Sequence, residues 1–491
     1  MELFLHIDKS APGSLQAKLR ERVSEAIARD VFDQGQPLPS TRALAASLGI
    51  SRNTVMAVYQ GLVSEGALSI RGRHGFFVAA STISRPNLPA PEPSAAGVDW
   101  QARLTQRFSD LRNPRIPRGW RDLKYKFVYG QHDRWIFPIA DWRRCSRDSL
   151  SLHDMHDWTV DYVDADDPLL LDAFRRRVLP RRGFCADEAE ILVTVGAQHA
   201  LYLAAQSMVR PGTVVGIEEP SYADARNTFK LFGATLRPLP VDEEGLVVDA
   251  RLAGCDVVYV TPNHQSPTTA IMSPARRRAF LDAARLHDFV VIEDDYDTEG
   301  QFGGNPRPAL KSADRDGRVL YITSLSKLLS PGLRVGFLVG PRPLIEEIRV
   351  LRRLSIRHPP ANNQRTIALF LKGGYYESLL KRFHQDYEHR WRTLKSALSR
   401  HMPEYVVAPS HGGSSLWVRA PDGIDTEHLA RAAYARGVLI EPGARHFEGP
   451  ERPTCFMRLG FSSIRAEDIE PGIILLAQVA RQLASPQLVP A

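Results

Sequence analysis

The chain has few cysteines and no long hydrophobic run, and each absence excludes a class of protein. Four cysteines occur in 491 residues, at the separated positions Cys145, Cys185, Cys255 and Cys455. They show neither the paired spacing of a zinc site nor a disulfide framework, so we expect no metal and a reducing, cytoplasmic environment. No apolar stretch is long enough to cross a bilayer, and the first residues lack the pattern of a signal peptide. We therefore expect no membrane partner.

The length predicts more than one domain. A chain of 491 residues exceeds what one hydrophobic core usually organises, and its 43% hydrophobic and 24% charged content is ordinary for a globular protein. Residues 81–99 are rich in proline and nearly free of core-forming side chains, which is typical of an extended linker. We expect a first domain over residues 1–80, a linker over 81–118, and a large domain over 119–491 whose small subdomain begins at about residue 385.

The first domain is predicted to contain three helices and a hairpin. Apolar side chains recur at helical spacing over residues 14–29 and 51–65, with a shorter helix between them. Ser40 and Ser51 stand where they would cap the second and third helices. Residues 66–78 alternate in polarity, as a short hairpin does. This order predicts a helix-turn-helix followed by a wing.

The charge of this motif favours duplex DNA as its partner. Residues 36–80 contain four arginines and a single acid, Glu65. The whole chain carries a net charge of +7, and such a positive excess suits the phosphates of DNA. In a helix-turn-helix the start of the second helix enters the major groove, where Arg and Asn meet base edges. The residues expected to contact DNA are Ser40, Arg42, Ser51, Arg52, Asn53, Thr54, Arg71, Arg73 and His74.

In the large domain, a lone lysine follows an apolar strand in a loop rich in hydroxyl groups. The segment Tyr321-Ile-Thr-Ser-Leu-Ser-Lys327 is followed seven residues later by Arg334. Lysine condenses with an aldehyde to form a Schiff base, and hydroxyls with a nearby arginine suit a phosphate. Another apolar strand ends in Glu293-Asp-Asp-Tyr296, which offers an acid to a protonated pyridine nitrogen and a tyrosine to a phenolic oxygen. These strand ends predict pyridoxal phosphate, held by Lys327.

Alternating elements predict the fold that carries this site. Short β-rich runs alternate with helical stretches between residues 191 and 339, as in an α/β domain with a mainly parallel sheet. Such sheets bind ligands just beyond their strand ends. Gly196-Ala-Gln198 opens a helix after one such strand, where free N–H groups and the helix dipole attract phosphate. Long amphipathic helices and a small α/β subdomain should follow residue 355.

Together these motifs resemble a known family. Leu38-Pro-Ser-Thr-Arg-Ala-Leu-Ala46, Leu48-Gly-Ile-Ser-Arg-Asn-Thr-Val55 and Glu65-Gly-Ala-Leu68 resemble the winged helix of GntR-type bacterial repressors. The remaining chain resembles fold-type-I aminotransferases, so the whole is similar to MocR-type regulators. One departure is Phe76, which stands where the family usually has threonine. The resemblance implies a multidomain homodimer in which each winged helix lies near the partner's sensor domain.

The resemblance implies roles for single residues around the cofactor. Tyr222 matches the aromatic residue that stacks on the pyridine ring, and Asp294 matches the acid of the ring nitrogen, whereas strand alternation turns Asp295 away. Tyr296 matches the tyrosine of the phenolate. The family's phenolate-binding asparagine is missing before Pro267, so Asn263 or His264 could supply that contact, after Tyr296. The expected cofactor-binding residues are Gly196, Ala197, Gln198, Tyr222, Asn263, His264, Asp294, Tyr296, Ser324, Lys327 and Arg334.

Two further residues are expected to bind an effector. Arg458 resembles the family arginine that grips a carboxylate. In the GABA-responsive relative an arginine follows the stacking tyrosine by two positions, and here that position is Asp224. An acid there attracts an ammonium and repels a second anion, which argues against GABA or taurine in that orientation and favours diamino acids such as those of ectoine breakdown. The alternative is that Asp224 only pairs with Arg226 or another basic neighbour.

Three functions remain open at this point. The first is a pyridoxal-phosphate-dependent transcription regulator that senses a small amino acid or amine as an external aldimine. The second is a regulator of vitamin B6 metabolism that senses pyridoxal phosphate itself, and the third is an active aminotransferase. The complete winged helix and the linker favour regulation, because catalysis needs neither. We expect no physiological turnover, although the domain could retain half-reaction activity.

Overall fold

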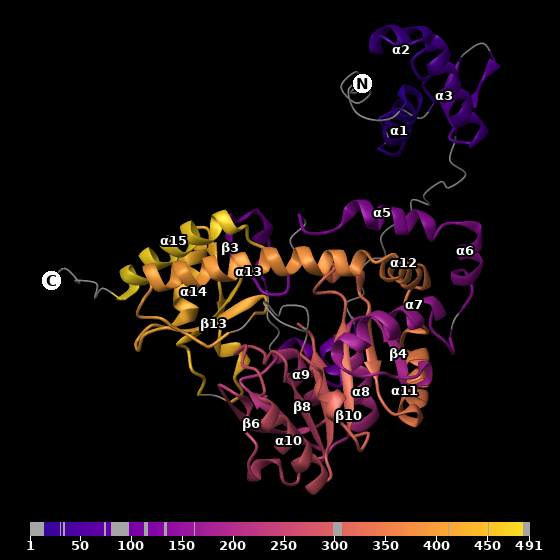
Figure 1. Cartoon of the computed structure of the whole chain (residues 1–491). Helices are drawn as coiled ribbons and strands as arrows, with labels where there is room; N and C mark the ends of the chain where they lie inside the picture. Colours follow the sequence, from indigo (N-terminus) through magenta and orange to yellow (C-terminus); the bar gives the residue numbers. More distant parts are fainter. Residues whose placement is uncertain are drawn as a thin grey trace, which may run out of the picture. The chain divides into compact units, whose positions relative to one another are not determined.

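The computed structural model describes residues 14–29, 31–32, 35–72, 75–79, 98–111, 116–131, 135–161, 163–297, 307–410, 412–449 and 451–484. These residues form two compact units, Met1–Leu104 and Thr105–Ala491 (Figure 1). Each unit has its own hydrophobic core. None of the helices in the described ranges combines the length and the hydropathy that a bilayer crossing needs.

The first unit is a winged helix-turn-helix. Its elements are α1 (Leu15–Ala28), α2 (Thr41–Leu48), α3 (Arg52–Ser64), the antiparallel strands β1 (Leu68–Ile70) and β2 (Phe76–Val78), and the short helix α4 (Trp100–Arg103). The Ser40 and Ser51 side chains accept hydrogen bonds from Ala43 N (3.2 Å) and Thr54 N (3.1 Å), as expected of N-caps. Gly49 ends α2 in the left-handed conformation, with φ of 57°.

One aromatic contact fastens the wing to the helices. The Tyr59 ring is fully buried in α3 and meets the Phe76 ring of β2 edge-on, with centroids 4.9 Å apart. The Tyr59 hydroxyl also donates to Pro39 O at 3.1 Å, which ties α3 to the turn before α2. Phe76, the departure noted in the sequence, therefore has a packing role in the wing.

The second unit contains an eight-stranded sheet that is mainly parallel. The strand order is β4-β11-β10-β9-β8-β5-β6-β7, and only β11 and β7 run antiparallel to their neighbours. The bounds are β4 (Ile191–Thr194), β5 (Val214–Glu219), β6 (Thr235–Asp242), β7 (Gly245–Leu246), β8 (Val257–Val260), β9 (Val290–Asp295), β10 (Val319–Ser324) and β11 (Gly336–Val339). The predicted α/β fold is confirmed.

Helices cover both faces of this sheet. Their bounds are α7 (Pro168–Ala173), α8 (Ala197–Met208), α9 (Ala223–Leu231), α10 (Pro274–Leu286), α11 (Arg342–Ile356) and α12 (Ala361–Lys372). Side chains of α8, α9 and α11 share one buried cluster with Ile292 and Ile322. On the other face, Val291 packs with α10, and Tyr321 packs in the cluster of α7 and α12. Neighbouring residues of one strand therefore enter different layers of the core.

A smaller α/β part follows the long helix α13 (Tyr375–His401). Its sheet has the order β12-β13-β16-β15, and a separate two-stranded pair joins β14 to β3 in parallel. The bounds are β3 (Tyr125–Lys126), β12 (Val406–Val407), β13 (Ser415–Arg419), α14 (Thr426–Ala435), β14 (Val438–Leu439), β15 (Glu441–Pro442), β16 (Phe456–Gly460) and α15 (Ala466–Ala484). A segment near residue 125 thus packs on elements more than 300 residues away.

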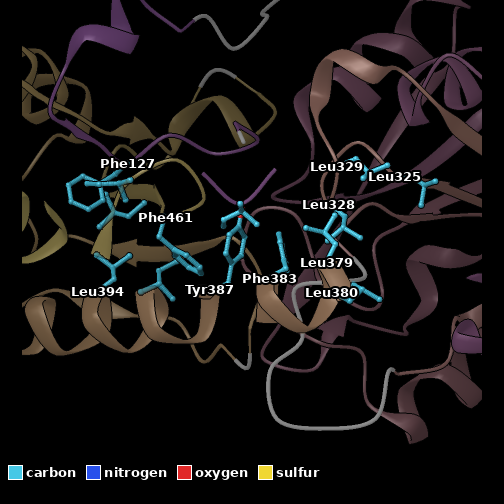
Figure 2. Close-up of a cluster of buried hydrophobic side chains, with 14 of the residues drawn as sticks. Phe127, Leu325, Leu328, Leu329, Leu379, Leu380, Phe383, Tyr387, Leu394 and Phe461 are labelled. Atoms are coloured by element: carbon cyan, nitrogen blue, oxygen red, sulfur yellow. The ribbon is translucent and has the colours of Figure 1, made fainter. Parts of the chain in front are cut away.

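The loop that carries the key lysine is anchored in this core. Leu325, Leu328 and Leu329 are buried at the end of β10 and pack in the same cluster as Phe383 and Tyr387 of α13. Figure 2 shows these side chains between the loop and the helix. Burial of three leucines fixes the loop, since each buried side chain of this size contributes about 1.5–3 kcal/mol.

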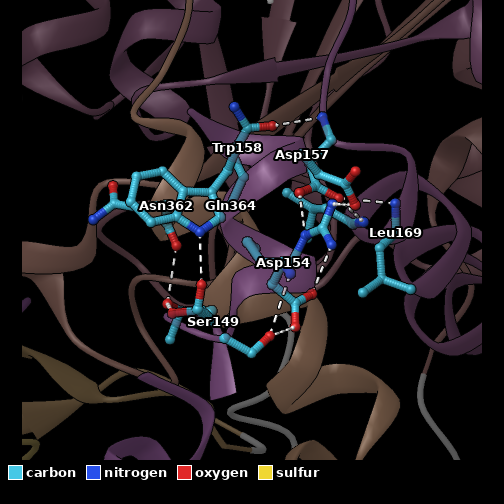
Figure 3. Close-up of polar contacts among 12 residues, drawn as sticks. Ser149, Asp154, Asp157, Trp158, Leu169, Asn362 and Gln364 are labelled. Atoms are coloured by element: carbon cyan, nitrogen blue, oxygen red, sulfur yellow. Dashed lines mark hydrogen bonds and ion pairs between the residues drawn. The ribbon is translucent and has the colours of Figure 1, made fainter. Parts of the chain in front are cut away.

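The helices α5 (Ile139–Asp148) and α6 (Leu152–Trp158) pack on α12, and a buried ionic network ties α6 to it. Arg365, only 3% exposed, pairs with Asp167 at 2.7 Å, Asp154 at 2.8 Å and Asp157 at 2.9 Å. Figure 3 shows the network together with the hydrogen bond from Trp158 Nε1 to Ser149 O, which measures 2.6 Å. Three acids around one arginine satisfy a buried charge that would otherwise be costly.

Candidate cofactor and effector site

A cavity of about 210 Å³ lies where the strands β9 and β10 end, beside the start of α8. It brings together eight of the eleven residues expected to bind the cofactor. These are Ala197, Gln198, Tyr222, Asp294, Tyr296, Ser324, Lys327 and Arg334. Gly196, Asn263 and His264 do not line it.

Lys327 is half-buried in the wall of the cavity. Its Nζ lies 4.0 Å from the centroid of the Tyr129 ring. Burial lowers the pKa of Lys327 to about 8, although Asp297, Asp294 and Glu441 oppose the shift. A lysine with this pKa has an appreciable neutral amine fraction near neutral pH, which a carbonyl-attacking nucleophile requires.

Asp294 presents one free carboxylate oxygen. The Tyr259 hydroxyl donates to its Oδ2 at 2.7 Å, whereas its Oδ1 is buried and has no hydrogen-bond partner. Burial raises the pKa of Asp294 to about 6, and Asp295 adds to the shift. A buried acceptor left unsatisfied is unfavourable. Oδ1 therefore suits a ligand that brings an N–H group, such as a protonated pyridine.

Asp295 faces the other side of the strand. Its Oδ2 accepts from Arg182 Nη2 at 2.6 Å and from the Tyr321 hydroxyl at 2.8 Å. Asn263 Nδ2 donates to Asp295 Oδ1 at 3.0 Å, and Asn263 Oδ1 accepts from Arg277 at 2.6 Å. Both polar atoms of Asn263 are thus engaged away from the cavity, so the geometry gives no support to Asn263 as the phenolate ligand.

Ser266 stands beside Tyr296 instead. Both residues line the cavity, and burial raises the pKa of the Tyr296 hydroxyl. His264 lies behind Tyr296, with ring centroids 6.1 Å apart, and its Nε2 is 3.8 Å from Asp297 Oδ2. Burial lowers the pKa of His264. Its position outside the lining gives no support to a direct cofactor contact.

The other end of the cavity suits a phosphate. Gly196 precedes α8 with φ of 84°, and a Cβ there would come within 2.6 Å of the Arg334 guanidinium, so the close approach requires glycine. Arg334 Nη2 donates to Val195 O at 2.9 Å. The Ser324 and Ser326 hydroxyls lie 2.9 Å apart in the same wall. A helix N-terminus, two hydroxyls and a guanidinium match what a phosphate dianion needs.

A second cavity of about 550 Å³ adjoins the first and shares Tyr129, Gly130, Tyr222 and Lys327 with it. Both residues expected to bind the effector, Asp224 and Arg458, line it. The Tyr222 hydroxyl donates to Asp224 Oδ2 and to Gln198 Oε1, each at 3.2 Å.

Asp224 does not pair with Arg226. That arginine donates to Ser221 Oγ at 3.0 Å and pairs with Glu448 at 3.3 Å. Because Arg226 is directed elsewhere, the Asp224 carboxylate remains part of the wall of the second cavity.

Arg458 has an acidic partner that sequence reasoning missed. Its Nε and Nη2 donate to the two carboxylate oxygens of Glu441, at 3.0 and 2.7 Å. Burial alone would raise the pKa of Glu441, but Arg458 and His446 hold it well below its usual value. Arg458 also stacks on Tyr129, with its guanidinium carbon 3.8 Å from the ring centroid.

The site contains several further residues that the sequence did not reveal. Those missed are Tyr129, Tyr259, Ser326 and Glu441, and Ser266 was noted only as a departure from the family pattern. Ser326 could have been found, because it lies between Ser324 and Lys327 in the hydroxyl-rich loop. Tyr129 and Glu441 carry no comparable signal, since each is a single residue next to a short apolar run.

The expected DNA contacts lie on the first unit. Arg42, Arg52, Asn53 and Arg71 are exposed, and Arg52 Nε lies 3.4 Å from Thr41 Oγ1 at the start of α3. Ser40, Ser51 and Thr54 take part in capping. Arg71 also lies over the Phe77 ring at 4.9 Å. Arg73 and His74 lie outside the described residues.

Comparisons with known proteins agree with both units. Residues 15–78 match the family described as bacterial regulatory proteins, gntR family, and residues 144–471 match aminotransferase class I and II. The chain is 41% identical over 470 residues to the HTH-type transcriptional regulator TauR of Rhodobacter capsulatus, which covers 96% of this chain and 97% of TauR. It is 29% identical over 495 residues to the probable rhizopine catabolism regulatory protein MocR of Rhizobium meliloti, covering 99% and 98%.

Among solved structures, the large unit is similar to the kynurenine aminotransferase of Pyrococcus horikoshii. The TM-score is 0.69 at 26% identity, over 74% of this chain and 92% of that one. The chain thus combines an aminotransferase fold with a GntR-type winged helix, and it matches two such regulators along nearly its whole length. The chain belongs to the MocR-type transcriptional regulators.

Proposed function

We propose that this regulator binds pyridoxal phosphate in the smaller cavity and senses a small amino acid or amine in the larger one. The observation that supports this most is that one cavity brings together the half-buried Lys327, the unpaired Oδ1 of Asp294 and the end around Arg334 that suits a phosphate. The likeness to aminotransferases of class I and II supports the same cofactor. When bound, pyridoxal phosphate supplies an aldehyde to which a primary amine attaches covalently.

Each part of the cavity has a task in this proposal. Lys327 holds the aldehyde carbon, Asp294 keeps the ring nitrogen protonated, and Tyr222 covers a ring face. Tyr296 with Ser266 contacts the phenolic oxygen. The phosphate is bound by Ala197, Gln198, Ser324, Ser326 and Arg334.

The second cavity supports an amine as the signal, in preference to the cofactor alone. It opens directly beside Lys327 and Tyr222, and its walls carry Asp224 and Arg458. An arginine can bind the carboxylate of an amino acid, and an acid can hold a second ammonium. These groups suit a diamino acid, such as 2,4-diaminobutyrate from ectoine breakdown.

The test uses the full chain with added cofactor. Lys327→Ala should lose the visible absorption of lysine-bound pyridoxal phosphate and the covalent mass increase after borohydride reduction, while Lys372→Ala, at an exposed lysine, should keep both. Adding amines should then change the spectrum of the parent and alter its affinity for operator DNA. A Lys327→Ala chain that still gains the mass increase at one site would overturn the cofactor assignment.

A further inference from the structure

The ion pair between Glu441 and Arg458 gives the effector cavity a charge preference. Resting on the function proposed above, we infer that Glu441 is a specificity residue that makes the site prefer diamino acids to dicarboxylates. Both residues line the larger cavity, so an effector meets the pair and not an isolated arginine.

The pair is held rigidly by the small sheet. Glu441 of β15 lies directly opposite Arg458 of β16 in the antiparallel register, so the two side chains leave neighbouring strands together. His446 Nε2 lies 3.2 Å from Glu441 Oε1, and its Nδ1 lies 3.1 Å from Ser221 O. Contacts from two sides leave the Glu441 carboxylate little freedom to turn away when a ligand arrives.

The pair neutralises the arginine without using all its donors. The Glu441 carboxylate accepts from Nε and Nη2 of Arg458, and Nη1 of Arg458 has no hydrogen-bond partner in the described part of the chain. A ligand carboxylate can therefore still approach Nη1. It approaches a pair of zero net charge, however, so the attraction is weaker than toward a lone guanidinium.

The other charges of the cavity reinforce this preference. Glu427 and Arg431 are both exposed on α14, four residues apart, and so offset each other at the rim. Deeper in the wall, Asp224 and Glu441 stand with Arg458 and the half-buried Arg445. These four charges sum to zero. A second ammonium then gains from Asp224, whereas a second carboxylate depends on Arg445 alone.

The experiment compares selectivity ratios in cofactor-loaded full chain. The parent and Glu441→Gln are titrated with 2,4-diaminobutyrate, alanine and aspartate, and the spectral change reports binding. The parent should bind diaminobutyrate more tightly than aspartate. Glu441→Gln keeps the shape of the side chain but frees the Arg458 charge, so the aspartate-to-diaminobutyrate affinity ratio should rise roughly tenfold or more. Glu467→Gln, which removes an exposed acid of the same unit, should leave the ratio unchanged.

Two outcomes separate this inference from the function on which it rests. If the parent responds to no amine, the proposed function fails. If amines bind but Glu441→Gln keeps the parental ratio, only the role of Glu441 is overturned.

If Glu441→Gln does not fold, a second pair of variants tests the same inference. Arg458→Gln leaves Glu441 unbalanced and should disfavour aspartate further, and adding Glu441→Gln should return the ratio toward the parental value. Equal ratios in Arg458→Gln and in the double variant would also overturn the inference.

Discussion

Tyr259→Phe should shift the pH range in which the protein holds pyridoxal phosphate. The substitution removes only the hydroxyl that donates to Asp294 Oδ2 at 2.7 Å in a buried environment. Hydrogen bonds to charged groups contribute roughly 1.5–3 kcal/mol. One pKa unit corresponds to about 1.4 kcal/mol, so the loss equals about one to two units.

The direction follows from which form of Asp294 the hydroxyl stabilises. Tyr259 stabilises the carboxylate, so its loss should raise the pKa of Asp294 from about 6 to roughly 7–8. A protonated ring nitrogen pairs with the carboxylate form, so affinity is present above this pKa and is lost as the pH falls through it. At pH 7 the ionised fraction should drop from about nine-tenths to between one-half and one-tenth.

The assay is the dissociation constant of pyridoxal phosphate between pH 5 and 9. Tyr321→Phe is a matched control, because it removes a hydroxyl that donates at 2.8 Å to the neighbouring Asp295, which faces away from the cavity. The midpoint should move upward in Tyr259→Phe and stay in place in Tyr321→Phe. Equal shifts in both variants, or none in either, would refute the reasoning.

Two other predictions concern the first unit and the ionic network. Arg52→Ala should reduce discrimination between operator and unrelated DNA by roughly 1–3 kcal/mol at physiological salt, since Arg52 lies exposed at the start of α3; parental discrimination in a gel-shift titration would contradict the docking. Arg365→Met should destabilise the large unit by about 3–5 kcal/mol, because Asp167 would stay buried without its cation. Arg342→Gln, which breaks an exposed pair with Glu346, should cost at most about 1 kcal/mol in the same denaturant titration, and similar losses in both variants would count against the network.

Local patterns were sufficient to predict much of the fold and part of the site. The expected helix over residues 51–65 is α3 (Arg52–Ser64), with Ser51 as its cap, because caps and apolar spacing are encoded within a few residues. Asp294 and Asp295 face opposite ways because side chains alternate along a strand, and that rule needs no knowledge of neighbours. The lysine loop could be predicted because the residues that suggest its chemistry, Tyr321 to Lys327, are consecutive in the sequence.

Long-range pairings limited the rest. Tyr129 reaches the site because β3 pairs with β14, more than 300 residues later, and neither strand shows its partner in the sequence. The role of Glu441 could not be predicted, because it depends on the register between β15 and β16 that places Glu441 opposite Arg458.

The leucines that flank Lys327 have a consequence for genetics. Leu325, Leu328 and Leu329 fasten the lysine loop to Phe383 and Tyr387 on α13. Substitutions that create a void in this cluster would change none of the polar side chains that line the cavity. They would nevertheless allow Lys327 to move out of its position. A screen for chains that no longer respond to effector would therefore recover changes along the apolar face of α13, in a helix whose own residues carry none of the expected chemistry.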